Sequence, residues 1–156
     1  MPVKLYRLAH WFWLRGVPVI PQLIKIINRV VFSVVLPPSA QLGKGVLLSY
    51  HGLGTVIHRR AVSGDRVIVG TGVTIGGRAG HEAVPVIGEG AMIGSGAKVL
   101  GPVRIGRYAS IGANAVVLTD VPDFAVAVGV PARVIKYLSQ EEVPDYFSFI
   151  SDWPSK

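Results

Sequence analysis

The sequence lacks cysteine altogether, has no acidic residue before Asp65 and contains no long apolar run. Without cysteine, the chain has no disulfide, no thiolate nucleophile and no cysteine-based metal site. Its longest apolar runs are far below the roughly 18 residues that a membrane-spanning helix needs. The basic, Trp-rich start of the chain also lacks the small-residue cleavage site of a signal peptide. These absences predict a cytoplasmic protein.

Negative charge is missing from the front of the chain. The formal net charge is +7 over 156 residues, and all charged residues before Asp65 are basic: Lys4, Arg7, Arg15, Lys25, Arg29, Lys44, Arg59 and Arg60. A surface of this kind favours an anionic partner. The aromatic residues cluster near the two ends of the chain, away from the basic residues of its middle, so we predict no nucleic-acid partner.

A six-residue repeat dominates the second half of the chain. Branched aliphatic residues recur at every sixth position, and a second set of small apolar residues lies two positions before each next one. The first set is Ile87, Ile93, Val99, Ile105, Ile111 and Val117, and the second is Ala91, Ala97, Val103, Ala109 and Ala115. A fixed short repeat of this type is typical of a parallel β-helix with about 18 residues per three-sided coil. We therefore predict four to five coils between Leu42 and Val121.

The repeat is interrupted twice, and each interruption contains a histidine. About three extra residues separate Leu48 from Ile57, around His51, and a longer insertion that contains His81 follows Ile75. Loops that interrupt a regular scaffold often carry function. We therefore expect the chemistry of this protein at the two breaks.

Residues 1–36 lack the repeat and predict two short amphipathic helices, over 4–16 and 21–36, ended by Pro37 and Pro38. One interpretation is that they cap the open end of the β-helix or pack on a neighbouring subunit. The other is that Trp11, Phe12 and Trp13, flanked by arginines, contact an anionic membrane at its inner face. The domains expected are thus 1–36, a β-helix over 37–136 and an acidic, aromatic tail over 137–156 that packs back on the chain.

Several strings together resemble the hexapeptide-repeat acyltransferases, and among them the serine acetyltransferase-like branch. They are HGLGTVIHRRAVSGDRVIVGTGVTIGG, GEGAMIGSGAKVLG and the closing GVPARVIK. The resemblance implies a left-handed parallel β-helix, a homotrimer with active sites at the subunit interfaces, and acetyl transfer from acetyl-CoA to a hydroxyl. The short N-terminal helices resemble the members of the branch that acetylate capsule or exopolysaccharide.

A histidine is the expected general base, because imidazole is the side chain best matched to accept a hydroxyl proton near neutral pH. His51 corresponds within one residue to the catalytic histidine of the family, and His81 to a further histidine that contacts substrate. His58 is expected at a corner of the β-helix, pointing outward, and is the third candidate. The base is oriented by a backbone carbonyl, Asp65, Glu82 or a neighbouring subunit.

Other residues are expected to bind acetyl-CoA or the acceptor. The resemblance assigns Gly76 and Gly77 to the oxyanion and CoA, and Ser95 and Ala113 to the pantetheine groove. Small residues are equally needed at coil corners, which is the alternative for Ser95 and Ala113. Arg133 and Lys136 either face the CoA phosphates or are solvated. Around the acceptor we place Tyr50, Arg78 and Glu82.

The prediction of the acceptor is based on the absence of two carboxylates. The aspartates of serine-specific relatives fall on Ser49 or Tyr50 and on Val35 or Leu36, so nothing beside His51 would bind an ammonium group. We therefore predict a saccharide or lipid-linked saccharide acceptor in surface polysaccharide biosynthesis. The alternatives are a serine O-acetyltransferase and a non-catalytic trimeric scaffold. We expect no metal, because the spacing of His51, His58 and His81 does not match the three-histidine zinc site of a β-helical carbonic anhydrase.

Overall fold

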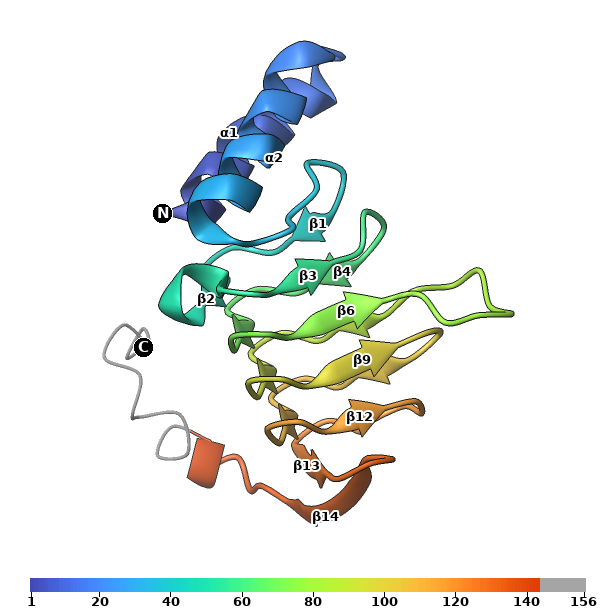
Figure 1. Cartoon of the computed structure of the whole chain (residues 1–156). Coiled ribbons are helices and arrows are strands. Elements are labelled where there is room, and N and C mark those ends of the chain that lie inside the picture. Colours follow the sequence, from blue (N-terminus) through green and yellow to red (C-terminus); the bar gives the residue numbers. More distant parts are fainter. Residues whose placement is uncertain (144–156) are drawn as a thin grey trace.

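A computed structural model of the chain describes residues 1–143 and shows two helices on one end of a three-sided β-helix (Figure 1). Helix α1 spans Pro2–Leu14 and helix α2 spans Val19–Phe32. Pro2 starts α1, where its missing N–H costs nothing, and the two helices pack side by side. The Asn28 side chain, which is buried between them, donates a hydrogen bond of 3.2 Å to the Pro2 carbonyl.

The β-helix consists of short strands that follow one another around three faces. The strands are β1 (Gln41–Leu42), β2 (Leu47–Leu48), β3 (Val56–Ile57), β4 (Val62–Ser63), β5 (Ile68–Val69), β6 (Thr74–Gly76), β7 (Val86–Ile87), β8 (Met92–Ile93), β9 (Lys98–Leu100), β10 (Arg104–Ile105), β11 (Ser110–Ile111), β12 (Val116–Val117), β13 (Ala125–Val128) and β14 (Arg133–Tyr137). A 3₁₀ turn, η1 (Ser49–Gly52), lies between β2 and β3.

Each face is one sheet. Face 1 contains β1, β4, β7 and β10, face 2 contains β2, β5, β8, β11, β13 and β14, and face 3 contains β3, β6, β9 and β12. All pairings are parallel except that of β13 with β14. We call the corner between faces 2 and 3 the η1 edge and the corner between faces 3 and 1 the loop edge.

The interior is filled by the residues of the six-residue repeat. The six aliphatic residues from Ile87 to Val117 are each at most 2% exposed, and the small apolar set between them is buried as well. Glycine is required at the corners, as Gly94 illustrates, because a Cβ there would lie 2.7 Å from the Ala113 backbone nitrogen. Ser63 takes an inward position on face 1, paired with Ile87, and its hydroxyl is buried without a hydrogen-bond partner.

The helices close one end of the β-helix through two side chains of α1. Tyr6 is almost fully buried, and its hydroxyl donates to the Ala40 carbonyl at 2.5 Å and accepts from the Leu42 N–H at 3.3 Å. The Arg7 guanidinium donates to the Leu42 and Gly43 carbonyls. At the other end, β14 turns back antiparallel on β13.

The C-terminal segment then runs onto the outer surface of face 2, where Leu138 and Val143 pack with Ile68 and Val126. The rest of the predicted tail, residues 144–156, lies outside the described part of the chain.

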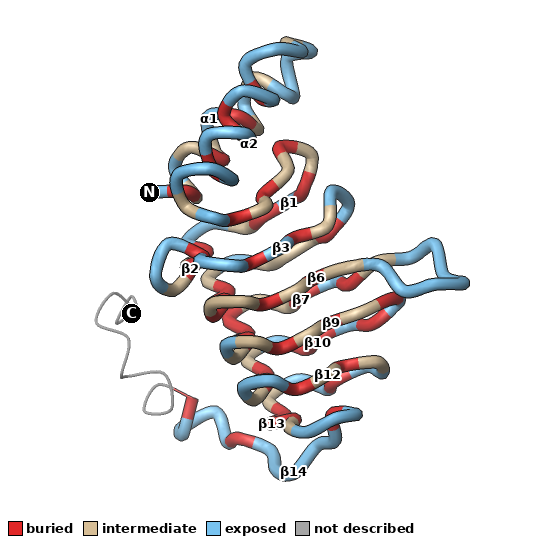
Figure 2. Tube along the Cα trace, viewed as in Figure 1, coloured by how far each residue is buried: buried red, intermediate tan, exposed pale blue. Residues whose placement is uncertain are grey.

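Helix α2 differs from its prediction in extent. It ends at Phe32 because Ser33 adopts a left-handed conformation (φ 52°), and residues 34–36 then run extended into the first coil, where Val35 bridges Val56. Leu23, Ile27 and Val30, which share one face of the helix, are exposed, whereas Pro21, Ile24 and Asn28 are buried. Figure 2 shows the exposed outer side of α2. Neither helix within residues 1–143 has the length and apolar content needed to cross a bilayer.

Candidate active site

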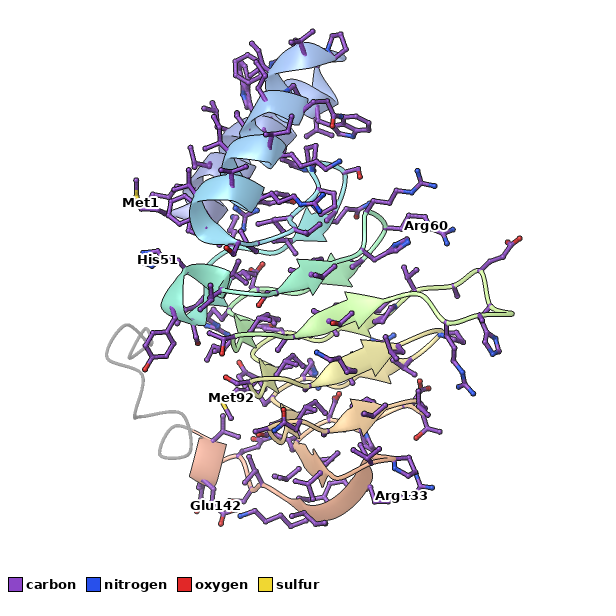
Figure 3. All side chains as sticks on the ribbon, viewed as in Figure 1. Met1, His51, Arg60, Met92, Arg133 and Glu142 are labelled. Atoms are coloured by element: carbon purple, nitrogen blue, oxygen red, sulfur yellow. The ribbon has the colours of Figure 1, made fainter. Side chains whose placement is uncertain are left out.

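His51 lies in η1, at the start of the η1 edge. The backbone there takes three successive positive φ angles: 48° at Tyr50, 60° at His51 and 76° at Gly52. Gly52 is buried, and a Cβ on it would lie 3.0 Å from the Leu48 Cδ1 and 3.1 Å from the Val34 Cγ2. The absence of a side chain at Gly52 lets the turn pack on the core while Tyr50 and His51 stay exposed. Figure 3 shows the labelled His51 pointing away from the β-helix.

The His51 ring is positioned by the end of α2. Its centroid lies 5.8 Å from that of the Phe32 ring, with an angle of 31° between the ring planes. Phe32 is half-buried against the core, so the helix fixes one side of the imidazole. Asp65, proposed as an orienting partner, lies between faces 1 and 2 instead, where its carboxylate accepts from the Lys44 N–H at 2.7 Å.

Small residues continue from His51 along the η1 edge. Tyr50, Thr71, Ser95 and Ala113 each lie two residues after an inward residue of face 2, and backbone hydrogen bonds connect the turns from coil to coil. The Gly96 N–H, for example, donates to the Thr71 carbonyl of the preceding coil at 2.7 Å. The Thr71 hydroxyl also donates to the Ser95 Oγ at 3.3 Å. The structure therefore places His51, Ser95 and Ala113 on one edge.

Sequence reasoning missed Thr71 and Phe32. Thr71 was detectable, because it occupies the same place after Val69 that Ser95 occupies after Ile93. The contact of Phe32 with His51 gives no sequence signal, since it depends on where α2 ends.

The second candidate group lies on the loop edge, in the loop 77–85 between β6 and β7. Arg78, His81 and Glu82 are all exposed, and the His81 N–H donates to the Arg78 carbonyl at 3.1 Å. Gly76 is the last residue of β6, and a Cβ on Gly77 would meet no atom within 4 Å, so the backbone next to the loop is accessible.

Two side chains hold this loop against the β-helix. The Arg60 guanidinium donates to the Glu82 carbonyl. The aliphatic part of Arg78 lies over Gly101, where a Cβ would be 2.8 Å from the Arg78 Cβ. Arg60 was not among the predicted site residues, and its role depends on a spatial contact between neighbouring coils.

His51 and His81 are not brought together within one chain. In Figure 3 the labelled His51 lies at one side of the β-helix, and the loop after β6 projects at the opposite side, near the labelled Arg60. The reason is the order of the faces: the first break precedes face 3 and the second follows it.

His58 lies on the loop edge, directly after β3. Its Nδ1 accepts a hydrogen bond of 3.1 Å from the Arg60 N–H. Burial lowers the pKa of His58, and the nearby Arg60 and Arg59 guanidinium groups lower it further. The residue also lines a groove of about 450 Å³ between α2 and the first coil, together with Lys25 and Arg59.

Arg133 and Lys136 are exposed on β14, at the end of the β-helix farthest from the helices (Figure 1). The Arg133 guanidinium donates to the Ala132 carbonyl at 3.0 Å. Residues 1–143 contain no group of three or more His, Asp or Glu side chains that would hold a metal ion.

A β-helix of six-residue repeats with histidines at its breaks defines a hexapeptide-repeat transferase, and comparison with known proteins gives the same class. The sequence model of the family described as bacterial transferase hexapeptide (six repeats) matches residues 85–119. The serine acetyltransferase of Bacillus pumilus is 37% identical over 153 residues, which are 92% of this chain and 70% of that protein. The chain belongs to the hexapeptide-repeat transferase family that includes the serine acetyltransferases.

Two further relatives support the same family assignment. The serine acetyltransferase of Synechococcus elongatus is 41% identical over 83% of this chain and 54% of that protein. The crystal structure of serine acetyltransferase in complex with coenzyme A from Brucella abortus has a TM-score of 0.83 at 35% identity, over 88% of this chain and 55% of that chain. This chain therefore spans about half the length of each of these two proteins. The predicted parallel β-helix with a short N-terminal helical segment is confirmed.

The prediction of a saccharide acceptor is wrong. The similar curated proteins and solved structures are serine acetyltransferases, and the resemblance to capsule or exopolysaccharide enzymes receives no support from them. The prediction weighed the carboxylates that are missing beside His51 in the sequence. Charged groups of the loop edge, such as Glu82 and Arg78, belong to another corner and did not enter that argument.

Proposed function

We propose that this protein transfers the acetyl group of acetyl-CoA to the hydroxyl of serine, with His51 as the general base. One observation carries the proposal. His51 is exposed in η1, at the start of an edge that continues with small residues in the following coils. The family relationship supports it, because the Bacillus pumilus relative of this chain is a serine acetyltransferase.

In the proposed reaction, the His51 imidazole takes the proton of the serine hydroxyl as its oxygen attacks the thioester carbonyl carbon. The tetrahedral oxyanion then collapses, the C–S bond breaks, and the thiolate of CoA takes the proton back from His51. The products are O-acetylserine and CoA. An imidazole suits this double role because it can both accept and return a proton near neutral pH.

The co-substrate fits the η1 edge. An extended pantetheine arm needs a path without bulky side chains, and Thr71, Ser95 and Ala113 provide one in successive coils of the edge that begins at His51. Arg133 and Lys136 are assigned to the CoA phosphates, because guanidinium and ammonium groups bind phosphate well. The accessible backbone of Gly76 and Gly77 is assigned to the oxyanion, which needs an N–H donor aimed at it.

The site is completed by a second chain, because the two histidine edges of one chain face different directions. A homotrimer puts the η1 edge of each protomer against the loop edge of the next and so makes three equal sites, as closed cyclic symmetry requires. His81 then assists His51 across the interface. In the same way, Arg78 binds the serine carboxylate, Glu82 its ammonium group, and Tyr50 covers the acceptor. The division into helices 1–36, β-helix 37–136 and tail 137–156 belongs to the same proposal.

The test is thiol release from acetyl-CoA by the purified full chain. We expect release with L-serine, and none with L-alanine, which lacks the hydroxyl. His51→Ala should lower turnover by about 10²-fold or more, while Leu53→Ala, an exposed neighbour in the same turn, should leave it unchanged. Turnover with glycerol but not with L-serine would refute the proposal that serine is the acceptor. A chain that CoA does not stabilise against heat, and that releases no thiol, would instead be a scaffold.

A further inference from the structure

Helix α2 presents a broad apolar face to solvent. Its members recur at the spacing of one helical face, and they are Val19, Ile20, Leu23, Ile26, Ile27, Val30 and Val31. Val30 is 75% exposed and Ile26 is 56% exposed. A contiguous apolar surface of this type marks an interaction site in a soluble domain. We call these seven residues the α2 face.

The charges around the α2 face are all positive. Lys25 and Arg29 lie on the same helix, and no acidic residue occurs in either helix or anywhere before Asp65. The ion pairs within residues 1–143 are Arg66 with Glu89 and Arg107 with Asp123, so none of them involves a cation of the two helices. Within residues 1–143, the side chains of the two helices thus combine exposed aliphatic surface with cations that have no acidic partner.

The placement of the helices leaves the α2 face open to a flat partner. Figures 1 and 2 show both helices projecting beyond β1 at one end of the β-helix, with the outer side of α2 exposed along its length. Tyr6 and Arg7 hold α1 on the first coil by hydrogen bonds, and α2 packs on α1. The face is therefore folded before any partner arrives, and ordering it costs no further chain entropy.

We propose that the α2 face rests on the surface of an anionic lipid bilayer. Aliphatic residues then enter the boundary between headgroups and acyl chains, and the exposed Arg29 at the margin of the α2 face meets the negatively charged headgroups. Trp11, which is 47% exposed on α1, is a type of side chain that favours this boundary. A second copy of the chain fits less well, because a contact between two such faces brings cations together without an acid on either helix.

The test is flotation of the full chain with vesicles of phosphatidylcholine, with and without phosphatidylglycerol. We expect binding to the anionic vesicles, weakened by raised salt, since headgroup attraction is screened. Removing one charge with Arg29→Gln should weaken binding about fivefold. Because the assay contains no acetyl-CoA, its outcome is separate from that of the proposed reaction.

A matched pair of variants isolates the α2 face. Ile26→Glu should abolish flotation, and Ile135→Glu, which alters the same residue type at 61% exposure on β14, should not. Both positions are exposed, so circular dichroism should show unchanged folding and melting. Equal flotation of the two variants would overturn the proposal. Absence of vesicle binding by the unaltered chain, with Ile26→Glu reducing its oligomer size, would assign the α2 face to a second copy instead.

Discussion

Two variants that are inactive alone should restore activity when they are assembled together. His51 lies on the η1 edge and His81 on the loop edge, on opposite sides of one chain. If each active site combines the two edges of neighbouring protomers, His51→Ala and His81→Ala damage different halves of it. A mixed trimer then contains some sites with both histidines intact.

The expected recovery follows from counting sites. In a trimer that contains both variants, in either two-to-one composition, one of the three interfaces joins an η1 edge that keeps His51 to a loop edge that keeps His81, so about one third of sites are complete. The variants would be produced together from two differently tagged copies, and the mixed trimers purified through both tags. Their activity is then compared with that of each variant alone. The loss of the general base places His51→Ala about 10²-fold below normal, and the loss of its assisting histidine lowers the activity of His81→Ala as well.

A second mixture gives the control. When unaltered chain is combined with a chain that carries both substitutions and the mixed trimers are purified in the same way, a site shared by two protomers is intact in about one sixth of cases, whereas a site within one chain is intact in about half. No recovery in the first mixture together with half activity in the second would refute the shared site. Full activity of His81→Ala alone would refute the part assigned to His81.

Three further changes have expected outcomes. Gly52→Ala should lower the free energy of unfolding by about 1–3 kcal/mol, because a methyl group there overlaps the core and strains a positive φ, and urea unfolding measures this. Ser63→Val should raise it by about 1–2 kcal/mol by removing a buried unpaired hydroxyl and filling an inward position, whereas Ser110→Ala, whose buried side chain has a partner, should lower it. A lower melting temperature for Ser63→Val would contradict the prediction that this substitution stabilises the fold. His58 should titrate below the ordinary histidine pKa of about 6.5 in NMR spectra, and Arg60→Ala should raise that pKa. Because the unfolded chain then binds the proton first, stability should fall as the pH drops below about 6.5, and His58→Gln should flatten this dependence.

The fold was predictable because the six-residue period fixes the direction of each side chain. From Ile87 to Val117 all the residues expected inside are buried, and Ser63 takes the inward position that its spacing indicates. Each six-residue repeat also corresponds to one face of the β-helix, so the order of the faces around the axis can be read from the sequence. Counting the faces from Leu42 along the sequence is therefore enough to place His51 and His81 on different edges.

The remaining features depend on contacts between distant segments. Helix α2 has apolar residues on two sides, and its sequence does not say which side meets α1. The identity of the acceptor depends on charges that gather from different corners, and for this reason the acids missing beside His51 were a poor guide to it. Arg60 illustrates the same limit, since its bond to the Glu82 carbonyl joins residues 22 positions apart.

The two ends of the β-helix have a consequence for polymerisation. A stack of parallel coils exposes unpaired backbone groups at each end, and an identical stack can add there to form a fibre. Here the Tyr6 hydroxyl and the Arg7 guanidinium occupy carbonyls of the first coil, and β14 reverses direction below the last one. Neither end matches the coil that another molecule would offer, and this mismatch disfavours end-to-end growth along the axis.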